Sequence, residues 1–176
     1  METQMIAVLG ATVEGRTLAA AALRARYRVV FEDFRADFLR EAMAAVRLAA
    51  GDSALARFRS ARTVEDACRE GASLILDCTT DEVELKLEIF TLLDKFAFPG
   101  AICATNATSI SIAELGAITY RPELCIGLRV RKIDGRAALE LVRSPHTLDS
   151  AVAACCEFAA RLGWGSSVCS EPSGGG

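Results

Sequence analysis

Histidine is almost absent from this sequence, since His146 is the only one among 176 residues. None of the seven cysteines belongs to a C-x-x-C pair, which excludes a zinc site of the usual spacing. The most apolar stretch is interrupted by Pro99, Gly100 and Asn106, so a membrane span is excluded as well. The first ten residues contain no Lys or Arg and do not resemble a secretory signal. An odd cysteine count without such a signal predicts reduced thiols and a cytoplasmic protein.

An excess of charge of either sign is also lacking. The 20 Lys+Arg and 23 Asp+Glu residues give a formal net charge of −3, which argues against a nucleic-acid binder. Apolar residues make up 52% and charged residues 24% of the chain, which excludes intrinsic disorder. The length suits one domain. We expect most cysteines to be small buried core residues, since four lie inside or at the end of apolar runs: Cys78, Cys103, Cys125 and Cys169.

Strand-like and helix-like segments alternate along the chain. The predicted strands cover residues 5–9, 28–31, 56–60, 73–77, 101–105, 125–130, 138–142 and 164–169. The predicted helices cover residues 14–26, 35–48, 63–69, 82–96, 111–116 and 148–162. This alternation predicts an α/β fold, a doubly wound and mostly parallel sheet with helices on both faces. The two consecutive strands between residues 125 and 142 predict an antiparallel excursion at the sheet edge.

A glycine-rich turn, Gly10-Ala-Thr-Val-Glu-Gly15, follows the first predicted strand and opens the first predicted helix. In a dinucleotide-binding fold the first glycine permits a tight turn and the last permits close helix–strand packing, with the pyrophosphate at the helix N-terminus. Asp33 ends the next strand, where an acidic residue binds the ribose hydroxyls and favours NAD over NADP. Thr12 takes the middle glycine position and Glu14 adds a carboxylate. The turn therefore fits either a nucleotide site or a Rossmann-like fold without its ligand.

The later segments that carry a further pattern are 81–90 (DEVELKLEIF), 99–100 (PG), 104–112 (ATNATSISI), 126–128 (IGL) and 139–142 (LELV). Together they resemble the NAD-binding domain of the 3-hydroxyacyl-CoA dehydrogenase family, and the Thr105-Asn106 turn is the most specific piece. The resemblance covers almost the whole chain. It implies a Rossmann-like domain over residues 1–170, NAD as cofactor, and oxidation of the 3-hydroxy group of an acyl-CoA. Residues 171–176 are expected to form a flexible tail.

The glycine-rich turn and the resemblance together give the candidate cofactor-binding residues: Gly10, Thr12, Val13, Gly15, Asp33, Asp81, Lys86 and Asn106. By the resemblance, Thr108 matches a hydroxyl that touches the substrate, and Glu140 matches a Glu that orients the catalytic His. Other interpretations stay open. Asp81 and Lys86 also suit solvated helix-end charges, Asn106 suits a turn, and Thr108 suits the cap of the helix that follows.

The sequence departs from the family at the catalytic base. In the family a His takes the hydroxyl proton as hydride leaves for NAD, and its position here holds Arg129. An Arg is not a base near neutral pH, because its pKa exceeds about 12. His146, beside Pro145, is expected in a solvated loop. Since acid–base catalysis contributes about 10²–10⁴-fold, the resemblance implies a weak or inactive isolated chain.

The family carries a helical domain after this one, and the resemblance ends at that junction. One wall of the acyl-CoA cleft is therefore expected to be missing, which predicts a homo-oligomer or a partner chain on the uncovered face. Three functions fit: an enzyme component, an interaction domain with a decayed cofactor turn, or a module binding NAD or a CoA-like anion. The anion would bind through Arg129, Arg131 and Lys132, which also suit a solvated edge strand. No metal is implied.

Overall fold

The structure is a computed structural model that describes residues 4–171. Its strands are β1 (Met5–Leu9), β2 (Arg28–Glu32), β3 (Phe58–Ala61), β4 (Leu74–Asp77), β5 (Ile102–Thr105), β6 (Cys125–Ile133), β7 (Arg136–Arg143) and β8 (Gly165–Ser170). Its α-helices are α1 (Val13–Arg24), α2 (Ala36–Ala50), α3 (Val64–Cys68), α4 (Val83–Phe96), α5 (Ile112–Ala117) and α6 (Asp149–Arg161). Every predicted helix and strand is present. Two short 3₁₀ helices, Asp52–Arg57 and Pro122–Leu124, were not predicted.

The strands form one sheet in the order β3-β2-β1-β4-β5-β6-β7-β8. Strands β1 to β6 are parallel, β7 is antiparallel to β6, and β8 is parallel to β7. The chain adds β2 and β3 on one side of β1 and then returns to add β4 on the other. Open parallel sheets bind ligands at the carboxyl ends of strands beside such a reversal. The predicted doubly wound α/β sheet is confirmed.

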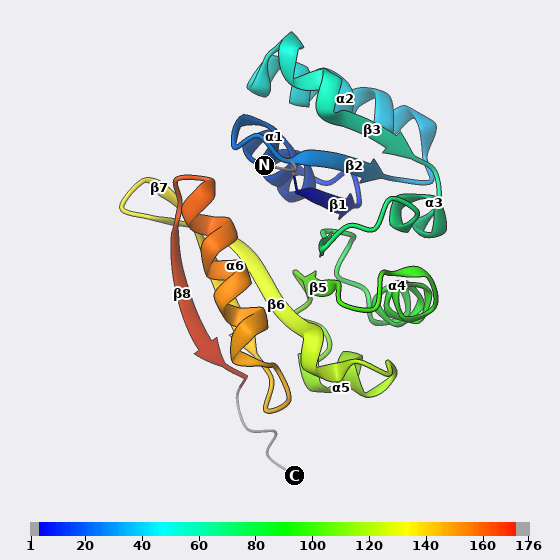
Figure 1. The fold of residues 1–176 in the computed structure, drawn as a ribbon, viewed down its shortest axis with the longest axis vertical. Helices are drawn as coiled ribbons and strands as arrows, with labels where there is room; N and C mark the ends of the chain where they lie inside the picture. Colours follow the sequence, from blue (N-terminus) through cyan, green and yellow to red (C-terminus); the bar gives the residue numbers. More distant parts are fainter. Residues whose placement is uncertain (1–3, 172–176) are drawn as a thin grey trace.

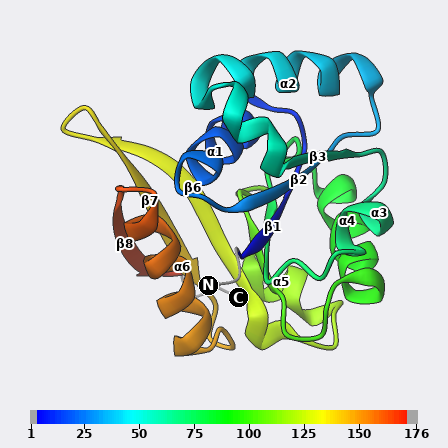
Figure 2. The same cartoon turned by 45° about the horizontal axis from the view of Figure 1, so that its top comes forward.

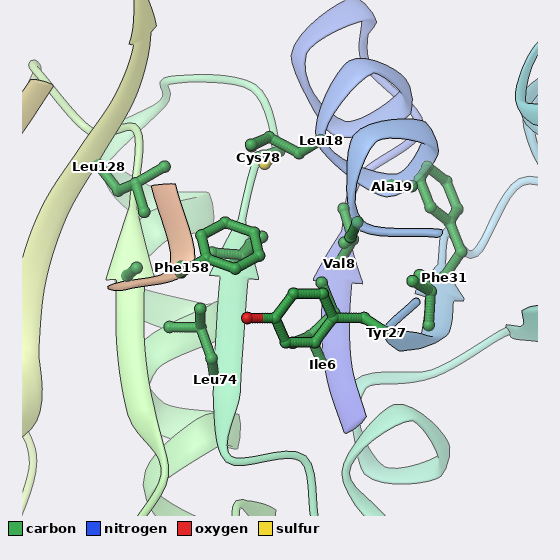
Figure 3. Packing of buried hydrophobic residues seen from close by; sticks show 14 of the residues in the cluster. Ile6, Val8, Leu18, Ala19, Tyr27, Phe31, Leu74, Cys78, Leu128 and Phe158 are labelled. Atoms are coloured by element: carbon green, nitrogen blue, oxygen red, sulfur yellow. The ribbon is translucent and has the colours of Figure 1, made fainter. Parts of the chain in front are cut away.

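Helices cover both faces of the sheet (Figures 1 and 2). Helices α1, α2 and α6 share one apolar core with the sheet, and α3, α4 and α5 share the other. Figure 3 shows part of the first core, where Tyr27 meets the ring of Phe158 from α6 edge-on, with ring centroids 5.4 Å apart. None of the described helices is both long and apolar enough to cross a membrane.

Hydroxyl side chains begin three of the helices. Thr12, Thr63 and Ser111 each accept a hydrogen bond from a backbone N–H in the first turn of α1, α3 and α5, respectively. Such caps satisfy donors that have no partner inside the helix. The cap at Thr63 confirms the predicted start of the third helix. The cap at Thr12 places the start of α1 at the carboxyl end of β1, where the glycine-rich turn lies.

The outer end of the sheet differs from three expectations. The antiparallel pair of β6 and β7 is confirmed, but β8 lies outside it and forms the edge. Cys169 is exposed because it belongs to this edge strand, whose residues are all exposed. Glu171, the first residue of the expected tail, continues the pairing, since its backbone N–H donates to the carbonyl of Arg143 at 2.9 Å. The rest of that expected tail, 172–176, lies outside the described residues.

Candidate functional site

The glycine-rich turn has the backbone shape that its glycines predict. Gly10 has a φ of +93°, and a Cβ there would lie 2.8 Å from the backbone of Thr79. A Cβ at Gly15 would lie 2.2 Å from the carbonyl oxygen of Gly10. Both glycines are therefore required by close backbone contacts, and this cradle fits a dinucleotide turn. Val13, the first residue of α1, is 73% exposed at this turn and is open to a ligand.

Thr12 stands where the dinucleotide pattern has its middle glycine. Its side chain connects the segment after β1 to the segment after β4. Its hydroxyl donates to the carbonyl of Cys78 at 2.8 Å and accepts from the N–H of Gly15 at 3.2 Å. The hydroxyl thus links the start of α1 to the residue after β4. The helix N-terminus keeps its orientation toward the crevice, although one of its donors is already satisfied by this cap.

Asp33 lies directly after β2 with only 3% of its surface exposed. Its carboxylate accepts the backbone N–H of Ala11 at 2.9 Å and that of Arg35 at 2.9 Å. The guanidinium of Arg35 adds two more bonds, each 3.0 Å long. Burial opposes ionisation, but these hydrogen bonds outweigh it and lower the pKa of Asp33. The predicted ribose acid is ionised and held between the glycine-rich turn and Arg35.

Lys86 is completely buried beneath the ends of β4 and β5. Its Nζ lies 2.9 Å from an oxygen of Asp77 and 2.7 Å from the side-chain oxygen of Asn106. It also donates to the backbone and side-chain oxygens of Thr79. A buried ammonium is tolerated only when it is paired and hydrogen-bonded in this way. In this conformation Lys86 has no surface open to a ligand. Its effect on a ligand is indirect, because its hydrogen bond determines the orientation of Asn106.

Asp81 organises the turn between β5 and α5. Its carboxylate accepts hydrogen bonds from the backbone N–H groups and hydroxyls of Thr108 and Ser109. Partial burial opposes ionisation, yet the bonds from Thr108 and Ser109 lower the pKa of Asp81 to about 2. The Thr108 hydroxyl is therefore held at a fixed place beside the crevice.

Arg129 and Glu140 are cross-strand neighbours on β6 and β7. Arg129 donates to the carbonyl of Ala107 at 2.6 Å and contacts Glu140 at 3.4 Å, while Arg131 reaches the same Glu140 oxygen at 2.8 Å. Arg129, Glu140 and Thr108 line one cavity of about 560 Å³, together with Cys169 on β8. The three predicted catalytic positions thus surround a single space at the carboxyl end of the sheet.

Glu14 closes a gap between α1 and β6. Its carboxylate accepts from the side-chain amide of Asn106 at 2.9 Å and from the backbone N–H of Val130 at 2.7 Å. Only the first three residues of β6 pair with β5, so the strand continues past its neighbour and leaves Val130 available to Glu14. A carboxylate therefore lies across the crevice beyond β4 and β5. We refer to this contact as the Glu14 bridge.

The sequence matches the family described as "3-hydroxyacyl-CoA dehydrogenase, NAD binding domain" over residues 5–171. This chain belongs to the 3-hydroxyacyl-CoA dehydrogenase family, as its NAD-binding domain. A 3-hydroxybutyryl-CoA dehydrogenase of Bradyrhizobium diazoefficiens is 33% identical over 172 residues, which are 90% of this chain and 58% of that protein. Human mitochondrial hydroxyacyl-coenzyme A dehydrogenase is 24% identical over 90% of this chain and 56% of its own length. The chain thus spans somewhat more than half the length of these relatives.

Solved structures confirm the fold of this NAD-binding domain. The crystal structure of (S)-3-hydroxybutyryl-CoA dehydrogenase from Ralstonia eutropha superimposes with a TM-score of 0.86 at 24% identity. The superposition covers 98% of this chain and 65% of that one. The superposition confirms the predicted Rossmann-like fold, and the family match over residues 5–171 confirms the predicted family and its NAD-binding class. The roles of single residues stay predictions.

The structure of the NAD-binding domain decides between several alternatives. Ser111, not Thr108, caps α5, because its hydroxyl accepts the backbone N–H of Glu114 and completes a capping box with the Glu114 side chain. Lys86 is not a solvated helix-end charge, since it has no exposed surface. The interpretation of Arg129, Arg131 and Lys132 as an exposed strand edge stays open, because this part of β6 pairs with β7 alone. His146 is exposed in the loop between β7 and α6, as predicted.

Two features of the site were not anticipated. Arg35 follows Asp33 by two residues, and that spacing is the only sequence signal for their ion pair. The sequence shows Glu14 as an added carboxylate in the glycine-rich turn, but nothing near it in the sequence predicts its hydrogen bonds to Asn106 and Val130. Within residues 4–171, no group of three or more His, Cys, Asp or Glu side chains is arranged to hold a metal ion.

Proposed function

We propose that this chain binds NAD at the carboxyl ends of β1, β2 and β4 to β6 and serves in 3-hydroxyacyl-CoA oxidation with little or no turnover of its own. The observation that supports this proposal is the cavity shared by Thr108, Arg129 and Glu140. The cavity offers a hydroxyl and a carboxylate to a substrate, but the group between them is a guanidinium. The acyl-CoA substrate and the residue roles belong to this proposal.

The guanidinium of Arg129 has no means of removing the hydroxyl proton. Arg has five N–H donors and no acceptor, and it stays protonated in proteins. Oxidation transfers a hydride from C3 of the substrate to NAD⁺ and the hydroxyl proton to a base. Without that base the proton must pass to water, and the rate falls by the 10²–10⁴-fold typical of general base catalysis. Arg129 is instead suited to donate hydrogen bonds to a substrate oxygen or carboxylate.

Two measurements test the proposal. Calorimetric titration with NAD⁺ and NADH should give heat with the native chain. Asp33→Ala should bind at least about tenfold more weakly, because the carboxylate holds the backbone of the glycine-rich turn at Ala11. Assays with 3-hydroxybutyryl-CoA and NAD⁺ should then show faster turnover for Arg129→His than for the native chain. Arg136→His, on the far end of the same hairpin, is the matched control and should change nothing. Absence of binding to either nucleotide would contradict the proposal.

The Glu14 bridge favours a second candidate, a binding module without redox chemistry. The carboxylate lies in the part of the crevice beyond β4 and β5, and it accepts a hydrogen bond from Asn106, a predicted cofactor contact. A module of this kind should bind NAD⁺ and show no turnover even as Arg129→His. The assays above therefore separate the two candidates.

We also propose that another chain or a second copy covers the edge strand β8. All six of its residues are exposed, including Val168 at 47%. An open strand edge with an exposed apolar side chain is suited to pairing. Light scattering across a concentration series tests this, and a monomer at every concentration would leave only a different partner chain as the occupant.

A further inference from the structure

The carboxylate of Asp33 has no oxygen left for a ribose. A carboxylate offers about four lone-pair sites, and those of Asp33 are filled by two backbone N–H groups and two N–H groups of Arg35. With 3% exposure, the side chain presents almost no surface to a ligand. What faces solvent at the end of β2 is therefore the outer edge of the Arg35 guanidinium rather than the acid.

Arg35 is held in place while keeping donors available. Its guanidinium lies 3.7 Å from the centre of the Phe38 ring and 5.3 Å from that of Phe34. The bonds to Asp33 use Nε and Nη2, which leaves Nη1 without a hydrogen-bond partner among the described residues. The side chain is 40% exposed. A guanidinium packed on aromatic rings, with one donor edge open, is preorganised for an oxyanion.

A second guanidinium meets the same segment from the neighbouring strand. Arg62, directly after β3, donates to the carbonyl of Phe34 from Nε at 3.0 Å and from Nη2 at 2.6 Å. Its side chain is exposed, and its Nη1 has no partner within residues 4–171. Two arginines from the ends of adjacent strands thus converge beside the residue that follows Asp33.

Nearby carboxyl groups leave one of these two positive charges uncompensated. Glu32 is buried, and its pKa is raised to about 7 by burial and then by Asp33 and Asp77, so it carries only part of a charge at neutral pH. Asp37, in the first turn of α2, is paired with Arg40. Asp33 itself is neutralised by Arg35, which leaves Arg62 as the uncompensated charge of the segment.

We propose that Arg35 and Arg62 form a subsite for a phosphate on the 2′-oxygen of the adenosine ribose, so that this domain accepts NADP as well as NAD. The inference rests on the proposed function, because it places the adenosine at the end of β2. An arginine near the ribose acid is the residue type that accommodates a 2′-phosphate in this class of fold. Arginine forks match phosphate geometry with two hydrogen bonds. Asp33 by itself would predict a preference for NAD over NADP. Its pairing with Arg35 takes the acid away from the ribose, so that prediction no longer holds.

The test uses adenosine fragments, which carry the adenosine ribose and its phosphates without the nicotinamide half of the cofactor. Adenosine 2′,5′-bisphosphate and ADP are titrated calorimetrically into the native chain, Arg35→Ala, Arg35→Lys and Arg62→Ala. Arg47→Ala, near the other end of α2 and paired with Asp52, is the matched control. Thermal melts establish that each variant is folded.

The native chain should bind the bisphosphate at least as tightly as ADP. Arg35→Ala should weaken the bisphosphate at least about tenfold, since charge-assisted bonds to phosphate are lost, and leave ADP binding equal or tighter because Asp33 becomes available. Arg35→Lys should lie between. Arg62→Ala should weaken the bisphosphate alone, and the control should match the native chain.

Three outcomes separate this inference from the proposed function. Native binding of ADP and NAD⁺ with weaker binding of the bisphosphate overturns the subsite and leaves the proposed function standing. Equal losses for both fragments in Arg35→Ala also overturn it, since Arg35 then only supports the fold of the site. Failure of every nucleotide to bind overturns both.

Discussion

Glu32 ends β2 with a carboxyl group that is 6% exposed. Burial, and then the charges of Asp33 and Asp77, raise its pKa from 4.5 to about 7, although Arg35 partly offsets them. In the unfolded chain the group ionises near pH 4.5. The folded state therefore holds the proton more tightly, and its stability falls as the pH rises from about 4.5 to about 7. The loss amounts to about 3 kcal/mol above this window.

Glu32→Gln should remove this pH dependence. The variant gains stability relative to the native chain as the pH rises from 4 to 8, by about 2–3 kcal/mol. Urea denaturation at both pH values measures it. Glu88→Gln, exposed on α4, provides the control and should follow the native curve. A constant difference between Glu32→Gln and the native chain across this range would show that Glu32 ionises normally.

The sequence predicted which residues belong to the site better than it predicted the contacts that those residues make. Asp33 was predicted because an acid after the second strand is part of the dinucleotide pattern. Its partner Arg35 was not, since many basic residues begin helices without binding an acid. Lys86 was equally ambiguous as a residue of α4, because its burial depends on the ends of β4 and β5 lying over it. These contacts are tertiary, and local patterns carry no information about them.

At the scale of elements, the Glu14 bridge joins α1 to β6 across 116 residues of sequence. Glu14→Ala should have two effects of opposite sign. The free energy of unfolding falls by about 1–2 kcal/mol, because Asn106 and Val130 lose an acceptor. NAD⁺ affinity rises about tenfold, because a negative charge leaves the crevice that receives the pyrophosphate.

Glu14→Gln separates the two effects in the same titrations and melts. It removes the charge and keeps one acceptor oxygen, so most of the gain in affinity should remain with a smaller loss of stability. Glu41→Ala, exposed on α2, is the control for removing a carboxylate. Unchanged NAD⁺ affinity in both Glu14 variants would mean that the carboxylate moves aside at no cost.

The elements themselves were predictable because each has a local cause. Runs such as Met5–Leu9 are apolar throughout, as expected of parallel strands covered on both faces. Glu82–Phe96 was predicted from helical periodicity, and α4 begins one residue later. The mostly parallel sheet with helices on both faces followed from the alternation of strands and helices. The position of β8 outside β7 was not predicted, since nothing in a short run of Gly, Ser, Val and Cys specifies its neighbour.

At the scale of the whole molecule, the reactivity of the cysteine thiols measures how well the two apolar cores exclude solvent. Five are buried, Cys156 is half-buried and Cys169 is exposed. Burial raises the pKa of Cys68 and Cys125 to about 11 and that of Cys103 and Cys155 to about 12. Since the thiolate is the reactive form, these thiols are protected by both position and protonation.

Thiol titration with a chromogenic disulfide should therefore give at most two reactive groups in the native chain and seven in denaturant. Cys169 should react first, and Cys169→Ser should remove the fast phase while leaving the melting temperature within about 1 °C. Cys155→Ser should leave the fast phase intact. Three or more thiols reacting without denaturant would show that the two cores open under native conditions.

Because β1 lies in the middle of the sheet, its two edges acquire their partner strands at different times during synthesis. One edge of β1 pairs with residues 28–32, but the other waits for residues 74–77. While the intervening segment is being made, an apolar strand exposes unpaired N–H and C=O groups to neighbouring nascent chains. The strand order that places the crevice beside β1 and β4 thus leaves an interval during synthesis in which one edge of β1 is open to aggregation.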